Sequence, residues 1–101
     1  MLKRLTFVIL LVFALATVTF AQTTLTGAGA TFPYPMYSKW FGDYHKLHSD
    51  IAINYQSIGS GGGIAQVTAG TVDFGASDGP MSDEQLSRAK TRIVHIPTVL
   101  G

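Results

Sequence analysis

Three glycine-rich segments of the sequence combine small residues with hydroxyl and carboxyl side chains, a composition that suits the binding of an anion. They are Gly27–Phe32, Gly59–Gly63 and Gly75–Gly79. Each precedes an expected helix, and the first backbone N–H groups of a helix lack intrahelical partners and carry a partial positive charge. Glycine lets such a backbone approach an anion closely, and Ser or Thr adds a hydroxyl donor. Three such segments at one place would form an oxyanion site without Lys or Arg.

Asp78, in the third segment, restricts which anion such a site would accept. A carboxylate only accepts hydrogen bonds, so it repels an anion unless that anion brings a proton. Hydrogen phosphate carries a proton at neutral pH and sulfate carries none, so Asp78 would favour phosphate over sulfate. The alternative interpretation is that Asp78 is a turn residue in Ser77–Pro80 that bonds to its own backbone.

The same segment also matches the G-x-S-x-G pattern of serine hydrolases over Gly75–Gly79. Under that alternative the protein is an exported hydrolase with Ser77 as its nucleophile and His95 as the base downstream. Pro80 would break the sharp strand-to-helix turn that this nucleophile needs. We therefore favour binding without catalysis, and we assign no catalytic residue.

Composition argues against several other functions. Seven Lys and Arg against six Asp and Glu give a formal net charge of +1, which leaves no basic stripe for nucleic acid. The chain has no Cys, so a disulfide framework and a thiolate metal site are excluded. His45 and His48 stand three residues apart on an expected helix, but no second ligand pair accompanies them. We expect neither a metal nor a cofactor.

Short apolar runs alternate with helical patterns, as is typical of βαβ units in an α/β protein with an open sheet. The expected strands are Thr24–Thr26, Ile51–Ile58, Val72–Ala76 and Arg92–Leu100. A first helix is expected from Pro33, with an aromatic face toward the sheet formed by Tyr37, Trp40, Phe41, Tyr44 and Leu47. A second is expected over Ile64–Ala69 with Gly70 as its stop, and a third after a capping box at Ser82–Gln85.

Residues 1–21 have the pattern of a secretory signal peptide. Lys3 and Arg4 precede the apolar run Leu5–Phe20, and small residues stand before a cleavage point at Gln22. The alternative is a membrane anchor, but spanning a bilayer takes about 20 apolar residues. We therefore expect an exported chain with no stable anchor, of which residues 22–101 are the mature part. Because this part ends on an apolar run, we expect it to be an incomplete domain.

The three segments and their spacing resemble the phosphate-binding proteins of bacterial high-affinity phosphate ABC transporters. The resemblance covers Leu25–Gly101 and rests on Leu25–Pro35, Tyr55–Gly63 and Val72–Ser82. It implies a periplasmic-binding-protein fold of type II, of which this chain holds the first part of lobe 1. It also implies a monomer in the periplasm that binds one inorganic phosphate and delivers it to the permease subunits of the importer.

Carried over by motif, the resemblance implies four phosphate-binding residues. Thr31 and Phe32 would supply backbone or hydroxyl donors, Ser60 would donate from the second segment, and Asp78 would accept the proton of phosphate. The chain departs from the family at Gly61, where a second Ser is frequent, and at a Gly in place of Ala after Asp78. The family's second lobe, whose Arg and Ser-Gly-Thr loop complete the site, lies outside this sequence.

Overall fold

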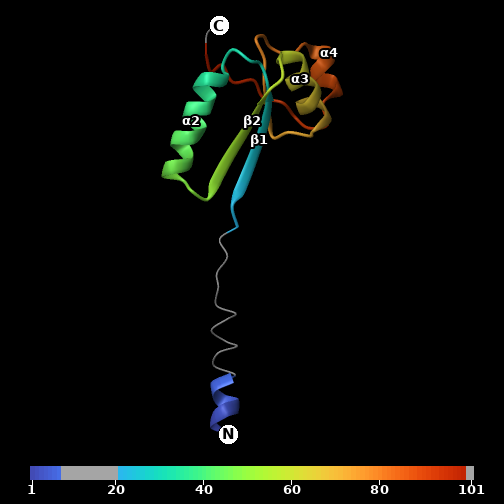
Figure 1. Ribbon diagram of the computed structural model, residues 1–101. Coiled ribbons are helices and arrows are strands. Elements are labelled where there is room, and N and C mark those ends of the chain that lie inside the picture. The colour runs from blue at the N-terminus through green and yellow to red at the C-terminus, as the bar shows by residue number, and fades with distance from the viewer. Residues whose placement is uncertain (8–20, 100–101) are drawn as a thin grey trace.

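The computed structural model describes residues 1–7 and 21–99 of the chain, and these form an α/β structure around a parallel sheet. Its elements are β1 (Thr23–Gly29), α2 (Tyr34–Leu47), β2 (Ile51–Ser57), α3 (Ser60–Ala69), β3 (Phe74–Ala76) and α4 (Asp83–Arg88). The strand order is β2-β1-β3. Figure 1 shows α2 on one face of the sheet and α3 on the other, with α4 beside α3. The expected α/β class with an open sheet of βαβ units is confirmed.

The N-terminal part of the chain is described only in part. Residues 2–7 are helical, and residues 8–20 lie outside the described residues, so the signal peptide at 1–21 stays a prediction. Among the helices that the structure describes, none is both long and apolar enough to cross a membrane.

Strand β1 is longer than the prediction of Thr24–Thr26, because the glycines that follow belong to the sheet. Gly27 pairs with Tyr55 of β2 on one side and with Phe74 of β3 on the other. The rings of these two residues stack with their centroids 6.2 Å apart. A Cβ on Gly27 would lie 2.2 Å from the Phe74 ring, so this position in the strand requires glycine. The first half of the predicted loop Gly27–Phe32 is therefore strand.

Helix α3 begins at Ser60, earlier than the predicted start at Ile64, so most of the predicted loop Gly59–Gly63 is the first turn of a helix. The physical reason is close packing. A Cβ on Gly63 would lie 2.5 Å from the Cα of Gly29 in β1. The missing side chain lets the helix backbone lie directly against the strand, which outweighs the low helix propensity of glycine. The end of the helix, with Gly70 in the left-handed conformation, is as predicted.

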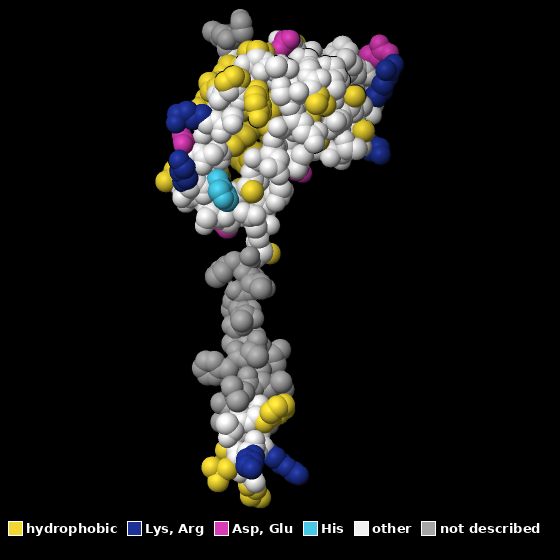
Figure 2. Space-filling view, viewed as in Figure 1, with side chains coloured by type: hydrophobic (Ala, Val, Ile, Leu, Met, Phe, Trp, Pro, Cys, Tyr) yellow, Lys and Arg dark blue, Asp and Glu magenta, His cyan; other side chains and the backbone are white. Residues whose placement is uncertain are grey.

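Helix α2 packs on the sheet through only part of its predicted aromatic face. Tyr37 is buried, and its ring meets that of Tyr55 edge-on at 5.3 Å. Phe41 likewise meets Phe74 at 5.9 Å. The other three members of that face are exposed: Trp40, Tyr44 and Leu47. The prediction that the whole face is core is therefore wrong in its outer half, and Figure 2 shows hydrophobic side chains at the surface of the folded part.

The elements around residues 72–90 are close to prediction. Strand β3 starts at Phe74 rather than Val72, because the Asp73 carboxylate accepts the N–H of Thr26 at 2.8 Å where a strand carbonyl would otherwise do so. Helix α4 begins after Ser82, whose side chain forms the predicted capping box with Gln85.

The predicted strand Arg92–Leu100 is wrong over its described residues, 92–99, which form no regular element. Within the described part of the chain, these residues make no backbone–backbone hydrogen bond, and Pro97 has no N–H to donate. Side chains hold the segment instead: the Met81 N–H donates to Nε2 of His95 at 3.0 Å, and Thr98 Oγ1 lies 2.9 Å from the Tyr37 hydroxyl. An apolar run does not form a strand where no neighbouring strand supplies hydrogen bonds.

Candidate functional site

The three glycine-rich segments meet at one edge of the sheet, where β1, β2 and β3 end. The Ala30 N–H donates to the carbonyl of Ala76 at 2.9 Å. The carbonyl of Gly29 accepts the N–H groups of Ile58 and Gly59 at 3.0 and 2.9 Å. The chain that follows β1 is thereby bonded to the chain that follows each of its neighbours. In open α/β sheets, this carboxyl edge is where ligands bind.

Ser60 and Asp78, from the second and third segments, are in direct contact. The Asp78 N–H donates to Oγ of Ser60 at 3.0 Å. Because the Ser60 oxygen acts as the acceptor in this bond, its own proton is free to be donated to a ligand. Next to it, the Gly79 N–H donates to Oγ of Ser77 at 3.3 Å, which gives the segment the hydrogen bond of a serine turn.

Thr31 and Phe32 lie on the exposed chain between β1 and α2. The carbonyl of Thr31 accepts the N–H of Tyr34, the first residue of α2, at 3.1 Å. Among residues 1–7 and 21–99, no hydrogen-bond acceptor is found for the N–H group of either residue. The two groups are therefore available to an anion. Within these residues no hydrogen bond joins them to Ser60 or Asp78, and the hydrogen-bonded connection runs through Ala30 and Ala76.

The electrostatics of this edge come from the start of α3 and from one carboxylate. Helix α3 begins at Ser60, so the positive end of the helix dipole lies at the residue that Asp78 contacts. Gly61 is next, and the space where its Cβ would stand is empty to 4 Å, which leaves the helix start open to a ligand. Asp78 is the one charged side chain in the three segments. This edge therefore combines neutral N–H and O–H donors with one carboxylate acceptor, that of Asp78.

Tyr55 also belongs to this edge, although it was not among the predicted site residues. Its hydroxyl donates to the carbonyl of Ala30 at 2.6 Å. Burial, together with the neighbouring Tyr37 and Asp78, raises the pKa of Tyr55 to about 12. A phenol with such a pKa stays protonated, and therefore a donor, at neutral pH. Tyr55 lies on the predicted strand Ile51–Ile58, but nothing in the sequence indicated the partner of its hydroxyl.

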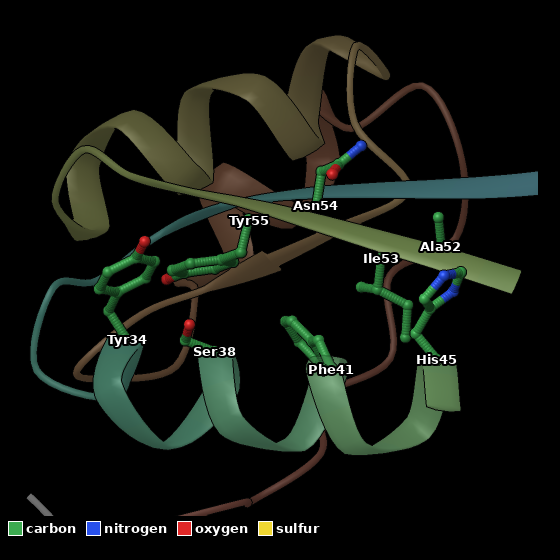
Figure 3. A pocket seen from close by; sticks show the side chains of 9 residues that line it. Tyr34, Ser38, Phe41, His45, Ala52, Ile53, Asn54 and Tyr55 are labelled. Carbon is green, nitrogen blue, oxygen red and sulfur yellow. The ribbon is translucent and has the colours of Figure 1, made fainter. Parts of the chain in front are cut away.

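A separate groove of about 430 Å³ lies between α2 and β2, away from the contact of Ser60 with Asp78. Figure 3 shows Tyr34, Ser38, Phe41 and His45 of α2 facing Tyr55 and Ile53 of β2 across it. His45 bonds through Nδ1 to the carbonyl of Ile51 at 2.7 Å. In the described part of the chain no group of three or more His, Cys, Asp or Glu side chains is placed to hold a metal ion.

The geometry does not support the hydrolase alternative at Gly75–Gly79. A serine nucleophile needs a base within hydrogen-bond reach. The Nε2 of His95 instead accepts the N–H of Met81, and Oγ of Ser77 accepts the N–H of Gly79. The Nε2 of His95, which would have to accept the proton of the Ser77 hydroxyl, is therefore occupied by a backbone N–H.

The sequence and the fold agree with a known superfamily. Residues 15–101 match the family model of the PBP superfamily domain, and the chain belongs to that superfamily. It is 53% identical over 91 residues to the phosphate-binding protein PstS of Haemophilus influenzae, a match that covers 89% of this chain and 26% of that protein. It is 54% identical over 77 residues to PstS of Xylella fastidiosa, which covers 76% of this chain and 20% of the relative.

Solved structures agree on the fold. PstS from Borrelia burgdorferi superimposes with a TM-score of 0.62 at 18% identity, over 65% of this chain and 26% of that one. A phosphate-binding protein of a phosphate ABC transporter from Streptococcus pneumoniae gives 0.60 at 24% identity, over 69% and 27% of the two chains. The expected periplasmic-binding-protein type of fold is thus confirmed. The chain spans about a quarter of the length of the relatives that it matches.

Proposed function

We propose that this chain is part of a two-lobed protein that binds inorganic phosphate and delivers it to the permease subunits of an ABC-type importer. The observation that carries the proposal is the contact of the Asp78 N–H with Oγ of Ser60 at the start of α3. It brings the residue that carries the carboxylate next to a hydroxyl donor at one helix start. The relatives are phosphate-binding proteins, which supports the same conclusion.

The binding chemistry follows from which groups are free. The N–H groups of Thr31 and Phe32, the N–H groups at the start of α3 and the hydroxyls of Thr31 and Ser60 would donate to the phosphate oxygens. The Asp78 carboxylate would accept the remaining proton of hydrogen phosphate. Sulfate has no such proton, so it would bring an oxygen lone pair against the carboxylate. Binding without turnover is the activity, and it involves neither a cofactor nor a metal.

The proposal includes export. A signal peptide at 1–21 would be cleaved before Gln22, and the mature protein would act in the periplasm as a monomer without a stable membrane anchor. The basic start and the apolar run of the sequence support this. The N-terminal residue of the protein recovered from the periplasm tests it.

Replacement of Asp78 by Ala in the intact two-lobed protein tests the binding mechanism. Loss of a charged hydrogen bond is expected to weaken phosphate binding by ~1.5–3 kcal/mol, about 10- to 150-fold in Kd, while sulfate binding improves relative to phosphate. Titration calorimetry with both anions measures the two affinities. The matched control is Asp83→Ala, which removes an exposed carboxylate from the first turn of α4. An unchanged preference for phosphate over sulfate in Asp78→Ala would refute the role of Asp78.

A further inference from the structure

The carbonyl of Ala30 is held by a side chain from another strand. The Tyr55 hydroxyl of β2 donates to it at 2.6 Å. The peptide bond between Ala30 and Thr31 is trans, because the described residues contain no cis peptide bond. In a planar trans peptide the carbonyl and the N–H point in opposite directions. Fixing the carbonyl of Ala30 therefore also fixes the direction of the Thr31 N–H.

The neighbouring peptide groups are held as well, so the Thr31 N–H cannot turn with a loose loop. Before it, the Ala30 N–H is bonded to Ala76 and the Gly29 carbonyl accepts two N–H groups. After it, the Thr31 carbonyl accepts the N–H of Tyr34. The peptide groups on both sides of the Thr31 N–H are thus bonded, whereas for the N–H groups of Thr31 and Phe32 no acceptor is found in residues 1–7 and 21–99.

The Tyr55 side chain is itself rigidly placed. Its ring stacks on Phe74 at 6.2 Å and on Tyr34 at 6.1 Å, and Tyr37 meets it edge-on at 5.3 Å. Figure 3 shows Tyr34 and Tyr55 side by side at one end of the groove. Aromatic neighbours on several sides restrict the position of the ring and therefore of its hydroxyl oxygen. The raised pKa of Tyr55 keeps that proton in place at neutral pH.

We propose that Tyr55 is a positioning residue of the phosphate site, which acts by aiming the Thr31 N–H at the anion through the carbonyl of Ala30. The inference rests on the proposed function and deepens it, since it assigns a role to a residue that does not itself touch phosphate. A preset donor needs no reorganisation when the anion binds, so it strengthens binding more than a donor on a free loop.

Tyr55→Phe separates the hydroxyl from the ring, and Tyr37→Phe is its matched control. Tyr37 belongs to the same aromatic cluster, but its hydroxyl contacts Thr98 and not the loop. In the intact two-lobed protein, calorimetry with inorganic phosphate should show a Kd about three- to tenfold weaker for Tyr55→Phe and less than about twofold weaker for Tyr37→Phe. Because the Thr31 N–H would serve any oxyanion, sulfate binding should weaken by the same factor, which leaves the anion preference unchanged.

A second measurement follows the Thr31 amide directly by NMR. In the wild type, phosphate is expected to shift this amide resonance and to slow its hydrogen exchange. Without ligand, Tyr55→Phe should already speed that exchange, since the peptide group is no longer held, whereas Tyr37→Phe should leave it as in the wild type. A p-aminophenylalanine at position 55, which restores an N–H donor, should return both exchange and phosphate affinity toward wild-type values.

The results distinguish this inference from the proposed function. If the wild type binds neither phosphate nor sulfate, the proposed function fails, and unchanged exchange of the Thr31 amide in ligand-free Tyr55→Phe would overturn the positioning role as well. If the wild type binds phosphate and Tyr55→Phe binds it equally well, the inference alone is overturned. Should Tyr55→Phe fail to fold, a Thr31 amide that phosphate leaves unmoved in the wild type overturns it.

Discussion

The two faces of the sheet are built on opposite principles. On the face toward α2, large rings fill the space: Tyr37 and Phe41 of the helix meet Tyr55 and Phe74 of the sheet. On the face toward α3, glycine leaves no side chain at the contact, and Gly63 lies directly against the backbone of β1. Figure 1 shows the two helices on either side of the strands. One helix is therefore held off the sheet by aromatic rings, and the other approaches it backbone to backbone.

The difference assigns separate tasks to the two helices. Close approach of α3 brings its first N–H groups to the carboxyl edge of the sheet, where an anion can use them. The rings on the α2 side give the sheet its apolar core and hold the Tyr55 hydroxyl against the carbonyl of Ala30. In the proposed site, the glycine face would supply the N–H donors of α3, and the aromatic face would fix the direction of the Thr31 N–H.

The largest effect is expected from filling the glycine face. Gly63→Ala would place a Cβ 2.5 Å from the Cα of Gly29 and 2.7 Å from the carbonyl oxygen of Ala28. Backbone atoms on both sides cannot yield, so α3 must lift from the sheet. We expect the free energy of unfolding to fall by more than about 3 kcal/mol, beyond the usual cost of overpacking. Urea unfolding of the intact protein measures it.

Gly61→Ala is the control for that experiment, because the space at its Cβ position is empty to 4 Å. Ala is the better helix former by about 0.8–1 kcal/mol, so this variant should be as stable as the wild type or more stable. Equal loss of stability in the two variants would mean that glycine content, and not close contact, matters on this face.

Filling the aromatic face should cost less. Gly27→Ala would place a Cβ 2.2 Å from the Phe74 ring, but a ring can turn where a backbone cannot. The price is loss of its stacking on Tyr55, so we expect about 1–3 kcal/mol of lost stability in urea unfolding. Adding Phe74→Leu should recover part of this loss in a double-mutant cycle. A cost above that of Gly63→Ala would reverse the comparison between the two faces.

The sequence predicted the elements better than it predicted the role of their glycines. Strand and helix periodicity located β1, α2, β2 and α3, and turn chemistry located α4. Glycine runs were interpreted as loops, yet Gly27 lies in a strand and Gly63 in a helix. Local propensity disfavours both placements, and contacts between residues far apart in the chain outweigh it. Such contacts are not visible in a single sequence.

The same limit applies to the candidate site. Helix-start chemistry predicted one site formed by the three segments, and the family resemblance implied Ser60 and Asp78 as two of its residues. The structure brings these two residues into contact. Tyr55 was not predicted because its hydroxyl bonds to Ala30, the residue that follows the neighbouring strand β1, and only the register of β1 with β2 makes that possible. The strand predicted at 92–100 is wrong because the local apolar pattern suggested it, whereas a strand forms only where a neighbouring strand pairs with it.

Ser60→Ala should have a smaller effect, confined to binding. The variant loses one neutral hydroxyl donor and the acceptor of the Asp78 N–H, so phosphate binding is expected to weaken by ~0.5–1.5 kcal/mol in calorimetry. Ser87→Ala is the control, because that hydroxyl bonds to Glu84 on α4. A loss larger than that of Asp78→Ala would place the main recognition on the hydroxyl rather than on the carboxylate.

The smallest effect is expected outside both faces, on the solvent side of α2. A hydrogen bond from Lys39 at 3.0 Å, together with its charge, holds the pKa of Asp43 below its usual value. A carboxyl with a lowered folded-state pKa stabilises the fold above its unfolded pKa, and this contribution is lost as pH falls through the folded pKa. Asp43→Asn should therefore shift the urea midpoint only slightly at pH 7, and the shift should vanish at acidic pH. Because the pair is exposed, added salt should reduce it too. A shift that persists at acidic pH would mean that Asp43 stabilises the fold through packing rather than through its charge. Both sides of α2 would then contribute packing to stability.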